Sequence, residues 1–549
     1  MRSFATLGVA LACGCAGSGH GPGAAVDASD ASDAPGDLTA DWVVSLPAGA
    51  PAAGRLSPRL LGHYDLSGAL LDYTHNTPLR TQMSAIGFAE WRVGLGRWEL
   101  ATRLLPTLAD GRATSCAGQL AQLPATVRAP DNATDDTLIA DRDWFADTGQ
   151  PVTLADTADD ARYRLAYVRD VLDTAAAFGA APFVGIDHMP RALGASRTFV
   201  RGGPPLAGVT DPCLATWTNH VSNVRPADPS VFAAAVVGAV RRVVEGSPGA
   251  APRSAPYWEV WNEPELGYAW DPSFELPPGT LDAYFATAIT TLTQLAAYRA
   301  ASASPAARGI KLGLGSFASA ATAVSTLGSL DHNPLPDGSF APIDFLSFHA
   351  YSNDPLAIVA AIGQVAAARA ASQHYRGIEL ALTEWGPDLA SPPPASTMDP
   401  ALLVATVIAR GAALGLDHAH HSLFYAFVPG LAYAVVGNDG APLPLYHAYE
   451  LLHAVIGSGA DRLAIASAPD GALGGGVGAV IAGRGADGAI RVLVVNRDTQ
   501  AHRVRIELAA AAQIARRIDV FADPAAPVHS VAPASVVSVP PRAIALFSL

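Results

Sequence analysis

The sequence predicts an α/β protein, with a (β/α)8 TIM barrel over residues 42–456 and a β-sandwich domain over residues 457–549. Short apolar runs suited to buried strands alternate with longer segments whose apolar residues recur at helical spacing. Eight such runs can be distinguished, which is the number that closes a parallel barrel. After residue 456 the pattern changes to Gly-rich and Val-rich alternation, which is typical of antiparallel strands.

The N-terminus predicts export. Arg2 precedes an apolar run and then two cysteines among small residues, so residues 1–15 are interpreted as a signal peptide resembling the bacterial lipoprotein type. Cys13 or Cys15 would then carry a lipid anchor, and an ordinary cleaved signal is the alternative. Residues 16–41 are rich in Gly, Ala, Asp and Ser and predict a disordered linker. We therefore expect a protein that is secreted, or anchored at the bacterial cell surface or in the periplasm.

The barrel strands are expected in chain order at residues 60–65, 90–93, 182–187, 257–262, 310–316, 343–349, 378–384 and 422–427. Outer helices are expected between them, with clear candidates at residues 162–178, 229–245, 281–300, 356–372, 400–414 and 445–456. The long segments 97–159 and 191–228 do not fit this repeat. They are expected to form loops over the catalytic face.

The C-terminal domain has its clearest strand candidates at residues 490–496 and 503–508. Residues 41–46 are a candidate for an additional strand of the same domain. If the protein is exported, Cys116 and Cys213 lie in an oxidising compartment, which makes them a candidate disulfide between two long loops. Two unpaired buried thiols are the alternative.

Composition excludes several classes of partner. The chain of 549 residues has a formal net charge of −14, so a basic surface for nucleic acid or an anionic membrane is not expected. A neutral or soluble polymeric substrate fits this balance better. No phosphate-cradling glycine loop precedes a predicted helix, and no cofactor is expected. The sequence does not indicate the oligomeric state.

Two predicted strands end on a glutamate beside a tryptophan. The fourth strand runs into Trp261-Asn262-Glu263-Pro264, and the seventh runs into Glu384 and Trp385. The carboxyl ends of barrel strands form the catalytic face, and a pair of carboxylates there is what glycoside hydrolysis uses. The tryptophans would offer flat apolar faces to sugar rings. The alternative for each glutamate alone is a strand cap or a structural ion pair.

Four separate motifs, WEVWNEPE, DFLSFHAYS, LALTEWGP and PLPLYHAYELL, together resemble family 39 of the glycoside hydrolases, in clan A. The resemblance extends from about Leu60 to the C-terminus. It implies a retaining double displacement, with Glu263 as general acid and base and Glu384 as nucleophile. Known activities of the family include β-D-xylosidase and α-L-iduronidase, and a β-xylosidase-like activity is the expected one.

The resemblance also implies substrate-binding roles for further residues. Asn262 would hydrogen-bond the sugar 2-hydroxyl, and Arg92 would hold the nucleophile ionised. His349 and Tyr351 would orient the nucleophile and contact substrate. Trp385 and Tyr425 are weaker candidates for the pocket wall.

Other functions stay open from the residues alone. A barrel that binds carbohydrate without turnover is one alternative, and an iduronidase, arabinosidase, glucosidase or endo-acting glycosidase is another. His418, His420 and His421 cluster before the expected eighth strand, but no zinc-ligand spacing accompanies them. No metal site is therefore expected.

Overall fold

The computed structural model describes residues 39–47, 49, 52–64, 77–95, 144–187, 189–195, 224–266, 281–388, 391–422, 435–436, 441–457, 459–466 and 478–549. Several predictions fall outside these residues, namely the signal peptide with Cys13 and Cys15, the candidate disulfide Cys116–Cys213, and Tyr425. Within the described ranges, no helix combines the length and hydropathy needed to cross a membrane.

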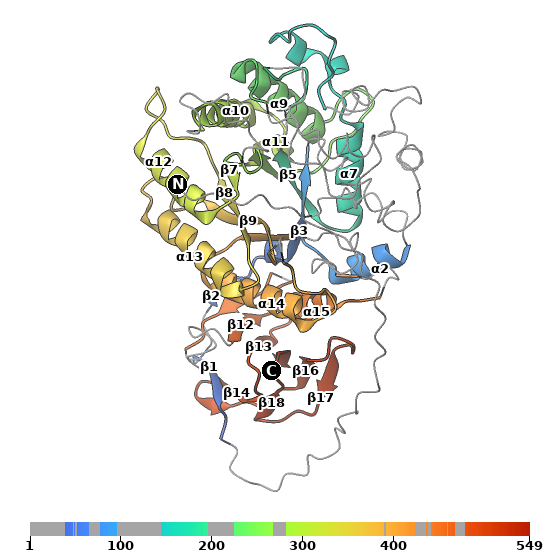
Figure 1. Cartoon of the computed structure of the whole chain (residues 1–549), viewed down its shortest axis with the longest axis vertical. Helices are drawn as coiled ribbons and strands as arrows, with labels where there is room; N and C mark the ends of the chain where they lie inside the picture. The colour runs from blue at the N-terminus through green and yellow to red at the C-terminus, as the bar shows by residue number, and fades with distance from the viewer. Residues whose placement is uncertain are drawn as a thin grey trace.

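A closed parallel barrel forms the larger part of the molecule (Figure 1). Its strands are, in sequence order, β3 (Gly62–Tyr64), β4 (Glu90–Gly94), β5 (Ala181–Ile186), β6 (Tyr257–Val260), β7 (Lys311–Phe317), β8 (Phe345–Tyr351), β9 (Glu379–Gly386) and β10 (His418–Ser422). The barrel closes because β10 pairs with both β9 and β3. The predicted barrel is therefore confirmed.

Each barrel strand is followed by a helix that packs outside it. These helices are α2 (Thr77–Ile86), α7 (Ala166–Ala177), α9 (Pro229–Val244), α10 (Asp282–Ala301), α12 (Ala320–His332), α13 (Pro355–Ala371), α14 (Met398–Ala413) and α15 (Pro444–Ile456). A short α11 (Pro305–Arg308) lies between α10 and β7. Helix α9 shows why these segments are helical. Asp228 caps its first amides, Pro229 occupies the first turn, and its apolar face is buried against the barrel.

The eighth strand corrects the sequence prediction. It covers His418–Ser422, whereas residues 422–427 were expected, and the three histidines lie inside the strand and not before it. All three are buried, and burial lowers the pKa of His421 to about 3. A neutral His421 packs like an aromatic residue against Trp385 and Tyr449. The polar composition of these residues is therefore the reason that the sequence did not predict a buried barrel strand here.

The floor of the barrel is filled by side chains that point inward from β5, β6, β8 and β9. Phe183, Tyr257, Phe345 and Ala381 form this cluster. Gly313 is required beside them, because a Cβ at that position would overlap the ring of Phe345. The lower half of the barrel is therefore a packed core, and an open site can form only at its upper end.

The C-terminal domain is a β-sandwich. One sheet contains β1 (Trp42–Leu46), β14 (His502–Leu508), β15 (Ala511–Ala512) and β18 (Val537–Val539). The other contains β2 (Ala52–Arg55), β11 (Asp461–Leu463), β12 (Gly478–Arg484), β13 (Ile490–Asn496), β16 (Arg517–Phe521), β17 (His529–Val531) and β19 (Ala543–Ser548). The N-terminal strands β1 and β2, which fall inside the range 42–456 expected for the barrel, thus pair with the sandwich.

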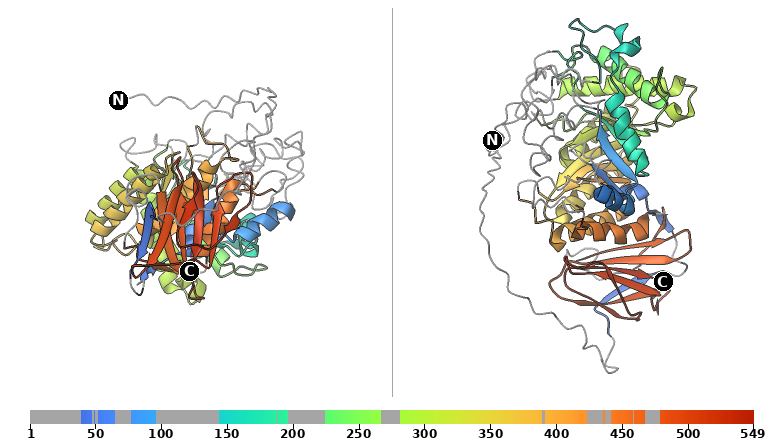
Figure 2. Two further views of the ribbon diagram at one scale, coloured as in Figure 1. Left: turned by 90° about the horizontal axis from the view of Figure 1, so that it is seen from below. Right: turned by 90° about the vertical axis from the view of Figure 1, so that its right-hand side faces the viewer.

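The sandwich is packed firmly against the barrel beside α14 and α15 (Figures 1 and 2). Ile481, Leu493 and Ile544 from the larger sheet belong to the same buried apolar cluster as the barrel helices. Arg410 of α14 also donates a hydrogen bond of 2.6 Å to the carbonyl oxygen of Gly478. The continuous core indicates that the sandwich supports the side of the barrel that carries β9 and β10.

Candidate active site

The end of β6 breaks the regular alternation of a strand. Trp261 and Glu263 have left-handed backbone conformations, with φ of 74° and 45°. The amide of Glu263 donates to the carbonyl oxygen of Ser316 at 2.8 Å, which holds this turn against β7. The turn aims Asn262 and Glu263 toward the barrel axis while Trp261 is buried outside it. Such conformations cost about 1–3 kcal/mol each and are typical of functional sites.

Bulges in β7 and β9 bring two more polar side chains to the same place. Phe348 pairs with Leu382 but His349 pairs with Glu384, so Thr383 is an extra residue in β9. Because side chains alternate along a strand, this extra residue turns Glu384 inward. An equivalent shift in β7 places Ser316 inward, with φ of 49°.

Glu263 and Glu384 face each other across the mouth of the barrel. Both are buried, with relative exposures of 8% and 7%. An oxygen of each carboxylate and a ring nitrogen of His349 all lie within 4.8 Å of one another. His349 Nδ1 is 2.8 Å from Glu263 Oε1 and 3.8 Å from Glu384 Oε2. Nδ1 of His349 therefore hydrogen-bonds to Glu263 and lies beside Glu384.

Glu384 is held by a cation and a phenol. Arg92 Nη1 donates to Glu384 Oε2 at 3.3 Å, and the Tyr351 hydroxyl donates to Oε1 at 2.6 Å. Burial raises the pKa of Glu384, and the charge of Glu263 acts in the same direction. The neighbouring His349, Arg92 and Tyr351 oppose that rise in pKa. Burial also raises the pKa of Tyr351, which keeps its hydroxyl protonated as a donor.

Arg92 is the centre of a buried polar network. It donates to Glu259 Oε2 at 2.8 Å and to Asn262 Oδ1 at 2.8 Å, and its guanidinium lies 4.5 Å from the centre of the Tyr64 ring. Burial disfavours the charge of Arg92, but Glu259 and Glu384 raise its pKa above the ordinary value. Arg92 is therefore a permanent cation between a structural carboxylate and the candidate nucleophile.

The tryptophans near the two glutamates do not lie where a sugar could stack on them. Trp258, Trp261 and Trp385 are all buried, with relative exposures of 0–1%. Trp258 donates to the carbonyl oxygen of Ala255, and Trp385 packs against His421 in the layer outside the barrel. This position does not fit the pocket-wall role expected for Trp385. The reason is the β9 bulge, which turns Glu384 inward and its neighbour outward.

Ser316 and Glu259 join the site although the sequence did not single them out. The Ser316 hydroxyl contacts Arg92, Asn262 and His349. The signal for Ser316 is weak, since it is one serine in the run Gly315-Ser316-Phe317, and its inward position depends on the bulge. Glu259 could have been found as a charged residue inside an apolar strand, where a buried partner is obligatory.

A second polar cluster lies lower in the barrel. His418 Nδ1 and His420 Nε2 lie 2.8 Å and 3.0 Å from the same oxygen of Glu90, and His418 Nε2 is 3.1 Å from Glu379. The atoms of Glu90, His418 and His420 are close enough to ligate a cation, as are those of Glu263, His349 and Glu384. In the lower group both histidines already hydrogen-bond to Glu90. In the upper group His349 hydrogen-bonds to Glu263, and Arg92 and Tyr351 hold Glu384, so hydrogen bonds account for the proximity in both groups without an ion.

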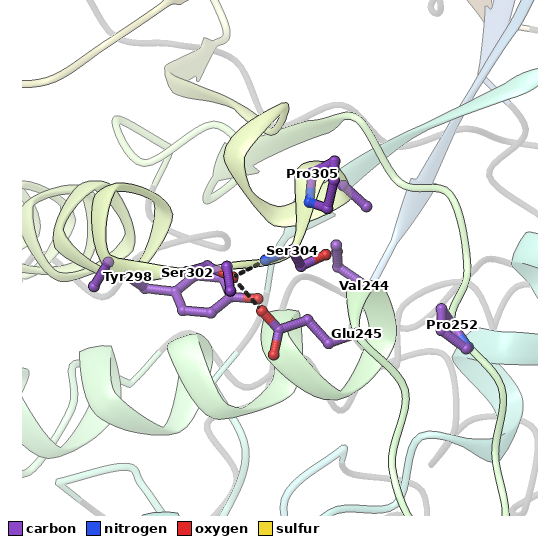
Figure 3. Close-up of a pocket in the computed structure, with 10 residues that line it drawn as sticks. Val244, Glu245, Pro252, Tyr298, Ser302, Ser304 and Pro305 are labelled. Carbon is purple, nitrogen blue, oxygen red and sulfur yellow. Dashed lines mark hydrogen bonds between the residues drawn. The ribbon is translucent and has the colours of Figure 1, made fainter.

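A surface pocket lies away from the carboxylate pair, at the opposite end of the barrel. It has a volume of about 720 Å³ and is lined by the C-terminal ends of α9 and α10 and by α11. Figure 3 shows Ser302 between Glu245 and the amide of Ser304, to both of which it is hydrogen-bonded. Helices end there before the next strand begins, so this pocket belongs to the N-terminal face of the barrel, which usually serves stability.

Comparison with known proteins shows which solved structures share this architecture. No protein-family model matches the sequence, and no curated protein matches it. Among solved structures, a family 39 β-xylosidase from Caulobacter crescentus superimposes with a TM-score of 0.56 at 17% identity, over 92% of this chain and 99% of that one. The chain has the fold of family 39 glycoside hydrolases. The family 39 resemblance expected from the four motifs is thus supported by an overlap that includes both domains.

The same fold extends to other glycoside hydrolases. A glucosidase from Croceicoccus marinus gives a TM-score of 0.56 at 16% identity, over 93% of this chain and 99% of the other. A family 51 α-L-arabinofuranosidase from Bifidobacterium longum gives 0.55 at 12% identity, over 93% of this chain and all of the other, at 100%. At these identities the shared property is the barrel with its sandwich.

Proposed function

We propose that this protein is a retaining glycoside hydrolase, with Glu384 as the nucleophile and Glu263 as the acid and base. The observation that carries the proposal is the close pair of buried carboxylates, in which one oxygen of Glu263 lies within 4.8 Å of one oxygen of Glu384. Retaining enzymes hold their two carboxyl groups about 5–5.5 Å apart, whereas inverting enzymes leave about 6.5–9.5 Å for a water molecule. The short separation therefore favours direct attack by one carboxylate.

The first step forms a glycosyl ester. Glu384 attacks the anomeric carbon, the bond from that carbon to the leaving oxygen breaks, and Glu263 transfers its proton to this oxygen. Arg92 and Tyr351 contact Glu384, so they favour its ionised form before attack. Asn262 presents its carbonyl oxygen to Arg92, which leaves its amide group to donate to a sugar hydroxyl.

The second step returns the enzyme to its starting state. Glu263, now a carboxylate, accepts a proton from water while the water oxygen attacks the anomeric carbon. The ester bond to Glu384 breaks and the sugar leaves with its original anomeric configuration. Both steps use the same two side chains, which is why they must lie on facing strands.

We propose a β-xylosidase-like specificity. It is supported by the family 39 motifs and by a fold shared with a family 39 β-xylosidase. The β-sandwich and the barrel also superimpose on a glucosidase and an arabinofuranosidase, so those glycones belong in the same assay.

The test is aryl-group release from a panel of aryl glycosides by the full chain, with Glu384→Ala as the control. The panel contains β-D-xyloside, α-L-arabinoside, β-D-glucoside and α-L-iduronide. We expect turnover of the xyloside that disappears in the control, and a first-formed product with retained configuration by NMR. A 2-fluoro glycoside of the active sugar should label Glu384, as located by mass spectrometry. An inverted product would contradict the mechanism, and silence from folded protein would favour a binding protein or an endo-acting enzyme.

Export and acylation form a separate proposal. The sequence of residues 1–15 supports a lipid anchor on Cys13 or Cys15. Metabolic labelling with a fatty-acid analogue should mark the full chain, and either Cys13→Ser or Cys15→Ser should abolish the label. Equal labelling of both single variants would contradict this proposal.

A further inference from the structure

The Ser316 hydroxyl sits at the junction of three site residues. Its Oγ accepts from Arg92 Nη2, lies 3.1 Å from Asn262 Oδ1, and lies 2.8 Å from His349 Nε2. Ser316 is buried, with 0% relative exposure, and its left-handed backbone is set by the β7 bulge. Its amide donates to Ser347 Oγ at 2.7 Å, so its position is fixed from both sides.

The donors and acceptors at this junction favour one arrangement. Arg92 can only donate, so the atom of Asn262 that faces it must be the carbonyl oxygen. That oxygen can only accept, and in this arrangement it takes the hydroxyl proton of Ser316, whose Oγ lies 3.1 Å away. The Ser316 oxygen then has only lone pairs left for His349. In this arrangement Nε2 of His349 carries a proton and donates it to Ser316.

This arrangement determines which atom faces the acid. A neutral imidazole with its proton on Nε2 has a lone pair on Nδ1. Nδ1 is the atom that lies 2.8 Å from Glu263 Oε1. A good hydrogen bond across this contact requires that Glu263 supply the proton.

We propose that Ser316 is a positioning residue that fixes the tautomer of His349, and that this tautomer keeps the catalytic proton on Glu263. The inference rests on the proposed glycosidase function. In the first step this tautomer keeps Glu263 protonated, so that Glu263 can transfer its proton to the leaving oxygen. After transfer, the Glu263 carboxylate faces a lone pair, which makes it a stronger base toward water in the second step. His349 neither gains nor loses a proton over the cycle.

Other charged groups also face the pair and must be held constant in a test. They are Arg92 on β4, Glu259 on β6, Glu265 after β6, Tyr351 on β8 and Glu384 on β9. The useful variant therefore changes only Ser316. Ser316→Gly removes the hydroxyl, and glycine suits the left-handed backbone at this position.

The experiment combines a direct and a kinetic readout on the full chain. Nitrogen-15 NMR of histidine-labelled protein, assigned with His349→Gln, reports which ring nitrogen carries the proton. We expect Nε2–H in the parent and Nδ1–H in Ser316→Gly, because the freed ring can then donate to the Glu263 carboxylate. That donation favours the ionised acid, so the basic limb of kcat/KM should move down by about one to two pH units.

Two further variants separate positioning from packing. Asn262→Ala removes the acceptor of the Ser316 proton, which should then turn to Nε2 and also produce the Nδ1–H tautomer. Thr406→Val removes a buried hydroxyl in α14 that bonds only its own helix, and it should leave both readouts unchanged. Asn262→Ala carries the NMR test if Ser316→Gly does not fold.

Three results would overturn the proposal. The first is Nδ1–H or a doubly protonated His349 ring in the parent. The second is an unchanged tautomer in Ser316→Gly. The third is lower activity in Ser316→Gly with an unmoved basic limb, since that marks a structural role. Failure of the proposed function gives a different result. If the parent protein is inactive, the pH dependence of kcat/KM cannot be measured and the catalytic role is refuted. The NMR measurement still determines the tautomer of His349.

Discussion

The buried pair of His418 and Glu90 should make the stability of the protein fall in mildly alkaline solution. Burial by itself would lower the pKa of His418, but the Glu90 carboxylate raises it to about 9. Burial by itself would raise the pKa of Glu90, but His418 lowers it to about 2. At neutral pH the folded protein therefore contains a charged pair with almost no exposure to water.

The size of the effect follows from proton counting. Between pH 6.5 and about 9 the folded state retains a proton on His418 that the unfolded state has released. The free energy of unfolding should therefore fall by about 1.4 kcal/mol per pH unit in this window, or about 3 kcal/mol in total. Below pH 6.5 this contribution is fully present. The Glu90 contribution runs oppositely, and is lost as the pH falls from 4.5 toward about 2.

The perturbation is Glu90→Gln, which keeps the shape and removes the charge. We expect a loss of roughly 3 kcal/mol near neutral pH, because a buried ion pair loses one partner. The alkaline slope should flatten at the same time, because the raised pKa of His418 depends first on Glu90. Urea unfolding followed by tryptophan fluorescence, from about pH 6 to pH 9.5, measures both quantities.

The matched control is Glu450→Gln, which makes the same chemical change in an exposed pair with His447. It should alter the free energy of unfolding by less than about 0.5 kcal/mol and keep the parent slope. If Glu90→Gln retained the full alkaline slope, His418 would not be the group that titrates. The assignment of a charged pair to His418 and Glu90 would then be refuted.

The other predictions concern the site and the core. Glu263→Ala should lower kcat/KM by about 10²- to 10⁴-fold for glycosides with poor leaving groups and leave kcat/KM nearly unchanged for those with good ones, so a flat leaving-group series in kcat/KM would contradict its role as acid. Arg92→Met should lower the free energy of unfolding by about 3–5 kcal/mol, because Glu259 is left buried and charged; urea unfolding with a loss below about 1 kcal/mol would contradict this. Gly313→Ala should cost about 1–3 kcal/mol in the same assay, and Phe345→Leu in the same chain should recover part of it, because the added methyl group overlaps that ring.

The sequence predicts most of the barrel because its strands and helices follow their ordinary periods. Helix α9 agrees with its predicted range of 229–245 within one residue, since Asp228 and Pro229 mark its start. The eighth strand was misplaced because His418–Ser422 contains no large aliphatic side chain. Its burial is explained only by partners on other strands, such as Glu90, which a single sequence does not identify.

The two glutamates of the candidate site were easier to predict than the residues that contact them. A carboxylate at a strand end is visible in a sequence, and Glu263 and Glu384 were found in this way. Their contacts depend on where alternation fails, namely the turn at Trp261 and the bulges at Ser316 and Thr383. A rule of strict alternation assigns Ser316 to the wrong face of its strand.

These irregularities share one physical cause. A regular barrel strand directs every second side chain inward, so neighbouring strands supply inward residues in layers about two residues apart. A site that needs Asn262 and Glu263 in succession, with His349 level with Glu384, cannot be built from regular strands. An extra residue or a left-handed one shifts the layer locally, at a cost of about 1–3 kcal/mol each. The packed floor beneath the site and the core shared with the sandwich bury apolar side chains, and burial of this kind offsets such a cost.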